Sequence, residues 1–369
     1  MEKPAVLIVS IVPELSVRIA SGLSKLGFKV SVLGKERFVG LRLLSCVKHY
    51  DVFDREYWND LELAEDFAAY TENYCDKWGI DIILPLEVTA TRLVRHAQQY
   101  LDTPTVALYD NDKRDFVNNK WNFFNFLQEH DLPSPDTHLL KDFDDIKLSS
   151  DDFPLIIKPL AEFGSNGIHR FDTYPALKTY LDTSGIQPPA IAQDFMPGVD
   201  YSVAVLARNG NLLAWAINKF NGDMSQREFV SNPEVLSLAR NIIEHMEYDG
   251  IAVLDIRYDE RDGSHKAIEI NPRIGSSDYF YSKAGINFSA LWIANSIGEE
   301  IEGVEFKPVT SGVVKLNLYE RLLPIFSSPP IDVFDNLIYG LSKRNRFLKN
   351  LYSIFVSRVL KRKDVFAAH

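Results

Sequence analysis

The chain has 369 residues, of which 46% are hydrophobic and 25% are charged. This length and composition are typical of a globular protein with two or three structural units, and they exclude disordered and collagen-like chains. The formal net charge of −11 argues against a nucleic-acid-binding protein, because neutralising phosphates requires clustered Lys and Arg.

The cysteines and the apolar runs bear on the location of the protein. Cys46 and Cys75 lack CxxC spacing, so neither a zinc site nor a disulfide framework is predicted. The opening MEKPAVLIVS lacks the basic leader and cleavage site of a signal peptide. The sequence has no run of about 18 apolar residues, the minimum for a membrane span. We therefore expect a cytoplasmic protein.

The N-terminal third alternates between apolar strands and amphipathic helices. Strands are predicted at residues 5–10, 29–33 and 81–85, and helices at residues 14–26 and 60–78. A strand, a helix and a second strand in this order indicate a parallel α/β unit. The first strand is followed by SIVPELS rather than GxGxxG, so we expect no dinucleotide site of the usual kind.

Beyond residue 112 the pattern changes. A helix is predicted at residues 120–129, and the prolines of LPSPDTHLL mark a break between subdomains. Two strands of a compact α/β segment are predicted near residues 154–158 and 190–195, and an antiparallel pair follows near residues 201–207 and 212–219. A helix near residues 233–246 then leads to a last hairpin near residues 251–258 and 266–270. From about residue 306 the regular pattern loosens.

The first strand of the last hairpin, GIAVLDIRY, has one apolar and one mixed face. Because side chains alternate along a strand, Ala252, Leu254 and Ile256 fall on one side. Val253, Asp255 and Arg257 fall on the other. With the turn centred near residues 262–263, Asp255 is predicted to lie across from Glu269.

The return strand, KAIEIN, is predicted to place Ile268 and Ile270 on the apolar face and Glu269 and Asn271 on the polar one. Asp255, Glu269 and Asn271 then converge. Paired carboxylates repel each other unless a cation or a shared proton lies between them, and Mg²⁺ prefers such oxygen ligands. From these residues alone, a solvated hairpin face explains the pattern equally well.

A lysine and a small-residue loop suggest a phosphate site. The strand in FPLIIKPLAEFGSNGI ends at Lys158, and a loop with Gly164, Ser165, Asn166 and Gly167 follows. Gly and Ser allow backbone N–H groups to approach phosphate closely, and a lysine supplies a point charge. The loop is not a Walker motif, and an ordinary hairpin turn remains the alternative. Lys120, which opens a helix, and Lys219, which ends a strand, are otherwise explained as surface lysines.

Together, these stretches resemble the ATP-grasp superfamily, specifically the carboxylate-amine ligases and their carbamoyl phosphate synthetase-like and biotin carboxylase-like relatives. The resemblance covers about residues 5–300. The matching stretches, in the family's order, are VNNKWNFFNFLQEHDLPSPDTHLL, LIIKPLAEFGSNGI, IAQDFMPGVDYSVAVL and GIAVLDIRY with KAIEINPRIGSS.

The resemblance implies a fold of mixed class, α/β and α+β. Residues 1–112 would form a parallel α/β, pre-ATP-grasp domain. Residues 113–305 would form a two-subdomain ATP-grasp fold with an antiparallel sheet, in which residues 140–196 are a small lid. Residues 306–369 would be a C-terminal extension with a basic end.

The resemblance also implies roles for single residues. Lys120 and Lys158 would hold the phosphates of ATP, and the loop at residues 164–167 would close over them. Asp255, Glu269 and Asn271 would bind two Mg²⁺ or Mn²⁺ ions. The residues expected around the base, ribose and reacting group are Gln193, Asp194, Phe195 and Met196 as the adenine hinge, Asp200 and Lys219 at the nucleotide, and Arg273 at the acyl phosphate or carboxylate.

Three departures from the family pattern are visible. The first metal position, Asp255, is Asp rather than the commoner Glu or Gln, and Asp200 stands where relatives usually have Glu. The loop EFGSNG also has only two glycines. All the chemical types that the reaction needs are still present.

The resemblance predicts an ATP-dependent ligase that activates a small-molecule carboxylate as an acyl phosphate and joins it to an amine. The alternatives are an ATP-grasp enzyme with another acceptor, a carboxylase or phosphotransferase, and a non-catalytic ATP-binding protein. A homodimer is the default expectation. Residues 340–369 carry eight Lys or Arg and one acidic residue, Asp364. For this end, packing on the body or on a dimer partner is favoured over contact with anionic lipid.

Overall fold

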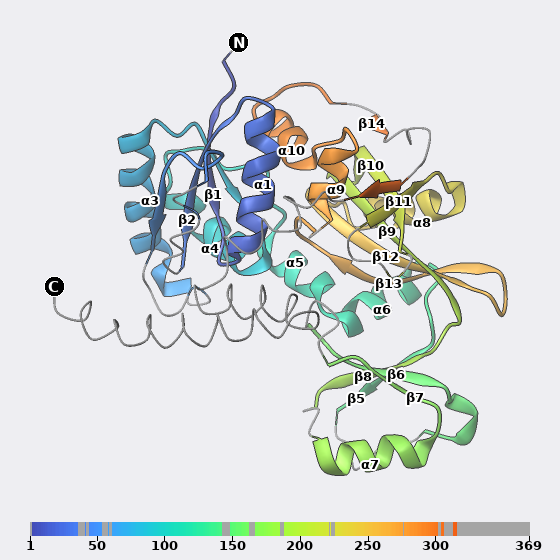
Figure 1. Ribbon diagram of the computed structural model, residues 1–369. Coiled ribbons are helices and arrows are strands. Elements are labelled where there is room, and N and C mark those ends of the chain that lie inside the picture. The colour runs from blue at the N-terminus through green and yellow to red at the C-terminus, as the bar shows by residue number, and fades with distance from the viewer. Residues whose placement is uncertain are drawn as a thin grey trace, which may run out of the picture.

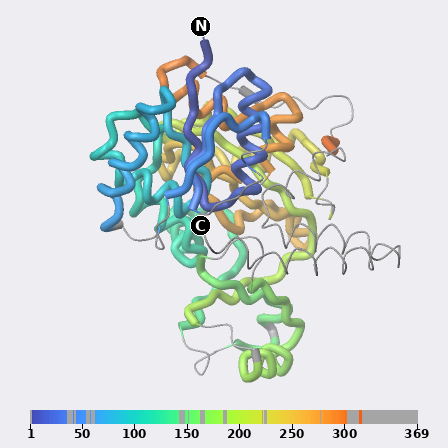
Figure 2. The backbone as a smooth tube through the Cα atoms, turned by 60° about the vertical axis from the view of Figure 1, so that its left-hand side comes forward, coloured from blue at the N-terminus to red at the C-terminus, as the bar shows by residue number. Residues whose placement is uncertain are grey.

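The structure is a computed structural model in which three sheets organise the chain (Figure 1). It describes residues 2–35, 41, 44–53, 58, 61–141, 148–161, 167–184, 188–220, 222, 226–275, 277–301, 304–305 and 313–315. A parallel sheet and a large antiparallel sheet form the body. A small sheet, with helix α7 beneath it, protrudes from the body in both views (Figures 1 and 2).

The N-terminal sheet is parallel, with strand order β3-β2-β1-β4. Its strands are β1 Ala5–Val9, β2 Lys29–Gly34, β3 Tyr50–Val52 and β4 Ile82–Pro85. Its helices are α1 Pro13–Lys25, α3 Ala64–Trp78 and α4 Val88–Ala97, with short 3₁₀ turns at η1 Leu61–Leu63 and η2 Gln98–Tyr100. Every residue of β1 is buried, because helices cover both faces of the sheet. The predicted parallel α/β unit is therefore confirmed.

The small sheet is antiparallel, with order β5-β8-β6-β7. Its strands are β5 Thr137–Leu140, β6 Leu155–Pro159, β7 His169–Phe171 and β8 Ala190–Asp194. Helix α7 Tyr174–Ser184 covers one face, and a 3₁₀ turn, η3 Ser150–Asp152, precedes β6. Leu155, Ile157, Leu177 and their neighbours form a core of its own. We call this part, residues 137–194, the small subdomain.

The large sheet has order β13-β12-β9-β10-β11-β15, and β14 pairs with β10. Its strands are β9 Gly198–Arg208, β10 Asn211–Lys219, β11 Gln226–Val230, β12 Gly250–Asp259, β13 Ser264–Asn271, β14 Val304–Glu305 and β15 Val313–Lys315. Helices α5 Asn111–Asn118, α6 Lys120–Glu129 and α8 Pro233–His245 lie along one face. Helices α9 Asp278–Lys283 and α10 Phe288–Ser296 lie along the other.

The parallel sheet and the large sheet share one core. Val6 and Ile8 of β1 belong to the same buried cluster as Leu206 of β9 and Trp292 of α10. The Trp292 Nε1–H also donates to the carbonyl of Ala107 at 2.9 Å. The body is consequently one packed unit, from which the small subdomain, with its separate core, stands apart (Figure 2).

The predicted mixed fold class is confirmed, and the predicted elements agree with the described ones to within a few residues. Of the predicted C-terminal extension, only residues 313–315 are described, so the basic end lies outside the described residues. Within the described ranges, no helix has the length and apolar character required to cross a membrane. The predicted domain boundaries stay predictions.

Candidate active site

A cavity of about 440 Å³ lies between the small subdomain and the large sheet. Its walls come from β6 and β8 on one side and from β9 to β13 on the other, and Arg273, Gly275 and Ser277 also line it. Most of the predicted site residues lie along it. Those that line it directly are Lys158, Gln193, Asp194, Phe195, Met196, Asp200, Asp255, Glu269, Asn271 and Arg273.

The three predicted metal ligands meet on one face of the β12–β13 hairpin. Asp255 pairs directly with Glu269 across the two strands, as predicted. The Asn271 Nδ2 donates to Glu269 Oε1 at 3.1 Å and lies 3.4 Å from Asp255 Oδ2. From β9, the Ser202 hydroxyl donates to Asp255 Oδ1 at 2.6 Å. Two carboxylates and an amide are therefore held together at the cavity wall.

The sequence prediction for Ile268 is wrong. A β-bulge follows Asp255, so that Ile256 pairs with Ala267 and Ile268 is the extra residue. Ala267 and Ile270 therefore enter the buried core, and Ile268 lines the cavity beside Glu269. A strict alternation along KAIEIN cannot reveal this change, because the extra residue resets which face each side chain occupies.

Two buried lysines bring positive charge to the acidic face. Lys120, at the start of α6, is 7% exposed, and its Nζ lies 3.1 Å from Glu269 Oε2. Lys158, on β6, is 6% exposed and donates to Gln193 Oε1 at 2.7 Å. Gln193 is itself fixed by its own donation to the Thr137 hydroxyl at 3.0 Å. Both lysines are buried, so the alternative that Lys120 is a surface lysine is excluded.

Burial and charge shift the pKa values of these groups in different directions. Burial, followed by the neighbouring Glu269 charge, raises the pKa of Asp255 to about 8. Burial also acts to raise the pKa of Glu269, but the charges of Lys120 and Lys158 outweigh it and lower that pKa. Burial lowers the pKa of Lys158 to about 8, although Glu269 partly opposes this. The site thus brings together ionisable side chains whose interactions are screened little by water.

The segment from Asp194 to Met196 lines the cavity, and most of its backbone donors are already bonded. The Asp194 and Phe195 N–H groups donate to the carbonyls of Asp136 and Pro154 at 2.9 and 3.1 Å. The Met196 carbonyl accepts from Arg257 Nε at 2.6 Å. Among the described residues, no hydrogen-bond acceptor is found for the Met196 N–H. One backbone donor at the cavity wall is thus available to a ligand.

Two arginines lie at the other end of the cavity. Arg273 Nη2 donates to Asn271 Oδ1 at 3.2 Å. Arg227 of β11, which the sequence analysis missed, is 7% exposed and directs its Nε to the Ser277 hydroxyl at 3.3 Å. Its guanidinium lies 4.8 Å from the ring centre of Phe280. The sequence feature that could have identified Arg227 is its position in QREFV, where it lies two residues before the buried Phe229 and therefore on the same, core-facing side of the strand.

The remaining predicted residues are distributed differently. Lys219, at the end of β10, does not line the cavity, whereas its neighbours Asn218 and Phe220 do. Gly164, Ser165 and Asn166 lie outside the described residues. Gly167 adopts φ +69°, and a Cβ there would lie 2.8 Å from Pro159 Cγ, so this turn requires glycine.

Asp200 is already engaged in the described structure. It forms an ion pair with Arg257, its cross-strand partner on β12. Both residues line the cavity. The sequence analysis placed Arg257 on the correct face of β12 without assigning it a role.

Comparisons with known proteins bear on the domain type and on the fold. Residues 117–277 match the family model of the ATP-grasp domain. The D-aspartate ligase of Enterococcus faecium is 24% identical over an alignment that covers 59% of this chain and 59% of that protein, so this chain spans less than two thirds of the relative's length.

Solved structures share the fold. The L-amino acid ligase of Bacillus licheniformis superposes with a TM-score of 0.63 at 22% identity, covering 81% of this chain and 75% of that one. The biotin carboxylase domain of Hydrogenobacter thermophilus 2-oxoglutarate carboxylase, solved with MgADP, ADP and bicarbonate, gives 0.63 at 14% identity, covering 83% and 72%. Residues 117–277 therefore match an ATP-grasp domain, and the chain shares the fold of both solved structures.

Proposed function

We propose that this protein is an ATP-dependent carboxylate-amine ligase. A small-molecule carboxylate attacks the γ-phosphorus of ATP, which releases ADP and leaves an acyl phosphate. An amine then attacks the acyl carbon and displaces phosphate, so that an amide or peptide bond forms. The observation that carries the proposal is the meeting of an acidic face, two buried lysines and a backbone segment with a free donor around one cavity.

Asp255, Glu269 and Asn271 would hold Mg²⁺ or Mn²⁺, and we propose two ions. Their hard oxygen donors fit these metals, which commonly use one or two carboxylates together with substrate phosphates. Among the described residues, no group of three or more His, Cys, Asp or Glu side chains is placed to hold a metal ion, so this site would supply two carboxylates and one amide. The donor set therefore leaves positions for phosphate oxygens and water. When bound, the metal supplies neutralisation of phosphate charge.

The cations of the chain would offset the charge that develops on the transferring phosphoryl group. Lys158, held by Gln193, and Lys120, held by Glu269, would contact the phosphates of ATP. Arg273 and Arg227 would bind the reacting carboxylate or the acyl phosphate at the opposite end. The loop at residues 164–167 would cover the phosphates and, with the small subdomain, keep water from the acyl phosphate.

The hinge would recognise the base and the sugar. The Met196 N–H would donate to the adenine ring, and Asp200 would accept from a ribose hydroxyl. Gln193 supports the hinge indirectly, because its side chain is used by Lys158 and Thr137.

The names of the similar proteins favour an amino acid as one substrate. The curated relative is a D-aspartate ligase, and one structural neighbour is an L-amino acid ligase. To test this, pairs of amino acids and small carboxylic acids are screened for ADP release, and the product is identified by mass spectrometry. The proposal requires ADP release that depends on both substrates and an amide product with one water fewer than their sum.

The metal assignment has its own test. Glu269→Gln and Asp255→Asn should each lower kcat by at least about a hundredfold. Glu260→Gln, which changes an exposed carboxylate in the turn of the same hairpin, is the matched control. Parent-like ADP release by Glu269→Gln at saturating substrates would show that the metal assignment is wrong.

A second candidate is a carboxylase, because the same fold occurs in a biotin carboxylase domain solved with bicarbonate. This alternative predicts ADP release that depends on bicarbonate and no amide product. Running the screen with and without added bicarbonate separates the two functions.

A further inference from the structure

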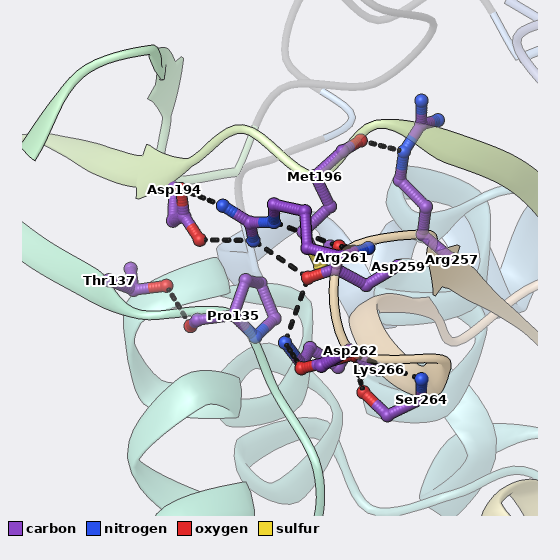
Figure 3. A network of polar contacts seen from close by, with 10 residues as sticks. All are labelled: Pro135, Thr137, Asp194, Met196, Arg257, Asp259, Arg261, Asp262, Ser264 and Lys266. Carbon is purple, nitrogen blue, oxygen red and sulfur yellow. Dashed lines mark hydrogen bonds and ion pairs between the residues drawn. The ribbon is translucent and has the colours of Figure 1, made fainter.

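The side chain of Arg261 connects the far end of the β12–β13 hairpin to the hinge. Figure 3 shows its guanidinium between two carboxylates. Arg261 Nη1 and Nη2 donate to Asp194 Oδ1 and Oδ2 at 3.1 and 2.6 Å. On its other edge, Nε and Nη2 donate to Asp259 Oδ1 and Oδ2 at 2.9 and 2.7 Å. Both edges of the planar fork are therefore used.

Asp259 gives this fork a rigid base. Its side chain is 0% exposed, and it also accepts from the Arg261 N–H at 3.0 Å and from Lys266 Nζ at 2.9 Å. These donors, Arg261 foremost, hold the pKa of Asp259 well below its usual range. Because the Asp259 carboxylate is buried and fully engaged, the Arg261 fork has little freedom to turn away from Asp194.

The backbone of the hinge is tied to the same end of the hairpin. The Glu260 N–H donates to the Pro197 carbonyl at 2.9 Å. Arg257 Nε donates to the Met196 carbonyl at 2.6 Å. The hairpin whose strands carry Asp255 and Glu269 thus also holds the segment at residues 194–197, of which Asp194, Phe195 and Met196 line the cavity.

Arg261 itself stays outside the main cavity. It lines a separate hollow of about 230 Å³ on the reverse side of the hinge, together with Gln193 and Asp194. Asp194 lines both spaces, and its carboxylate accepts from Arg261.

We propose that Arg261 is a positioning residue for recognition of the nucleotide base. Through Asp194 it holds the Asp194–Met196 backbone in the place where that backbone meets the edge of adenine, without touching the nucleotide. The inference rests on the proposed function, because it takes ATP as the ligand of the cavity. The inference predicts that a variant without this fork loses more of its preference for ADP over GDP than of its folding stability.

The test compares binding of ADP and GDP, in the presence of Mg²⁺, to the full chain by titration calorimetry. Asp194→Ala removes the hinge end of the fork and leaves the buried Asp259 with Arg261 and Lys266 intact. Arg261→Gln removes the fork itself. Each should weaken ADP binding by about tenfold and lower the ratio of the GDP and ADP dissociation constants. The double variant should bind ADP no more weakly than the single variant with the lower affinity, since both substitutions remove the same interaction.

Lys266→Met is the matched control, because it removes another partner of Asp259 but leaves the fork on Asp194. It should lower the thermal midpoint and leave both dissociation constants within twofold of the parent. Unchanged ADP binding, or an unchanged GDP-to-ADP ratio, in Asp194→Ala and Arg261→Gln overturns the inference. A parent protein that binds no ADP instead overturns the proposed function itself, which separates the two failures.

Discussion

At the scale of single residues, the site contains ionisable side chains whose charged forms are destabilised by burial. Lys158 and Asp255 are held where water screens them poorly, and burial shifts the pKa of each to about 8, from opposite sides. Such groups persist in a fold when a ligand compensates for their burial. Activity and stability should therefore respond differently to their replacement.

Lys158→Met tests this separation. The variant should lower kcat/KM for ATP by about a hundredfold or more, because the positive charge that we propose for the phosphate site is lost. Its free energy of unfolding should stay equal or rise, because a buried amine is replaced by an apolar chain of similar length. Lys178→Met, on the exposed side of α7, is the control for both measurements. A large loss of stability in Lys158→Met would contradict this account.

Asp278 predicts a dependence of stability on pH. Burial raises its pKa to about 7, and only the Ser289 hydroxyl, at 3.3 Å, opposes this. The folded state thus binds a proton that the unfolded state releases near pH 4, so the parent loses stability as the pH rises from about 4 to about 7.

Asp278→Asn does not titrate and escapes that loss. Relative to the parent, the variant should gain roughly 2 kcal/mol or more between pH 4 and pH 8, measured by urea unfolding at both values. An equal difference between variant and parent at both pH values would argue against the raised pKa.

At the scale of elements, the β12–β13 hairpin organises the site. Its bulge directs Ile268 and Glu269 into the same cavity, and its far end reaches the hinge through Arg261. The hinge continues into β9 at Gly198, where φ is +144° and a Cβ would lie 2.0 Å from the Tyr258 carbonyl oxygen. Only glycine allows this close approach of β9 to β12.

Gly198→Ala should therefore destabilise the protein by at least about 2 kcal/mol, because the carbonyl that it meets is backbone and has little freedom to shift. Gly263→Ala is the matched control. This glycine also has a positive φ, +71°, but its added Cβ has nothing closer than the Tyr258 hydroxyl at 3.7 Å. It should cost only about 1 kcal/mol. Equal losses in chemical denaturation would show that the contact with Tyr258 is unimportant.

At the scale of the whole molecule, the two cores differ in extent. The body joins the parallel sheet to the large sheet through one buried cluster, whereas the small subdomain has only its own core. A unit with fewer buried contacts opens at a lower free energy. Under the proposed function, the small subdomain would move over the nucleotide while the body stays fixed.

Hydrogen exchange distinguishes the two units. Ile157→Ala, in the small core, should speed exchange within residues 137–194 and leave the body protected. Leu206→Ala, in the shared core, should speed exchange in both sheets of the body. Each removes a fully buried side chain, at a cost of about 2–5 kcal/mol. Faster exchange throughout the chain in Ile157→Ala would mean that the protein opens as a single unit.

What the sequence determined by itself was local. Alternation along GIAVLDIRY placed Asp255 and Arg257 on one face, and the hairpin turn fixed the pairing of Asp255 with Glu269. These features depend on neighbours within one hairpin, where strand periodicity decides which way a side chain points. The serial order of the motifs supplied the fold and the ATP-grasp resemblance.

Only the tertiary structure decided which distant side chains meet. Lys120 reaches Glu269, Arg227 reaches Ser277, and Arg261 reaches Asp194, although long stretches of sequence separate the partners. The bulge that turns Ile268 into the cavity was likewise revealed only by the tertiary structure. No periodicity encodes such contacts, because they depend on how complete sheets and helices pack, and that packing sets the burial and the charge of the site.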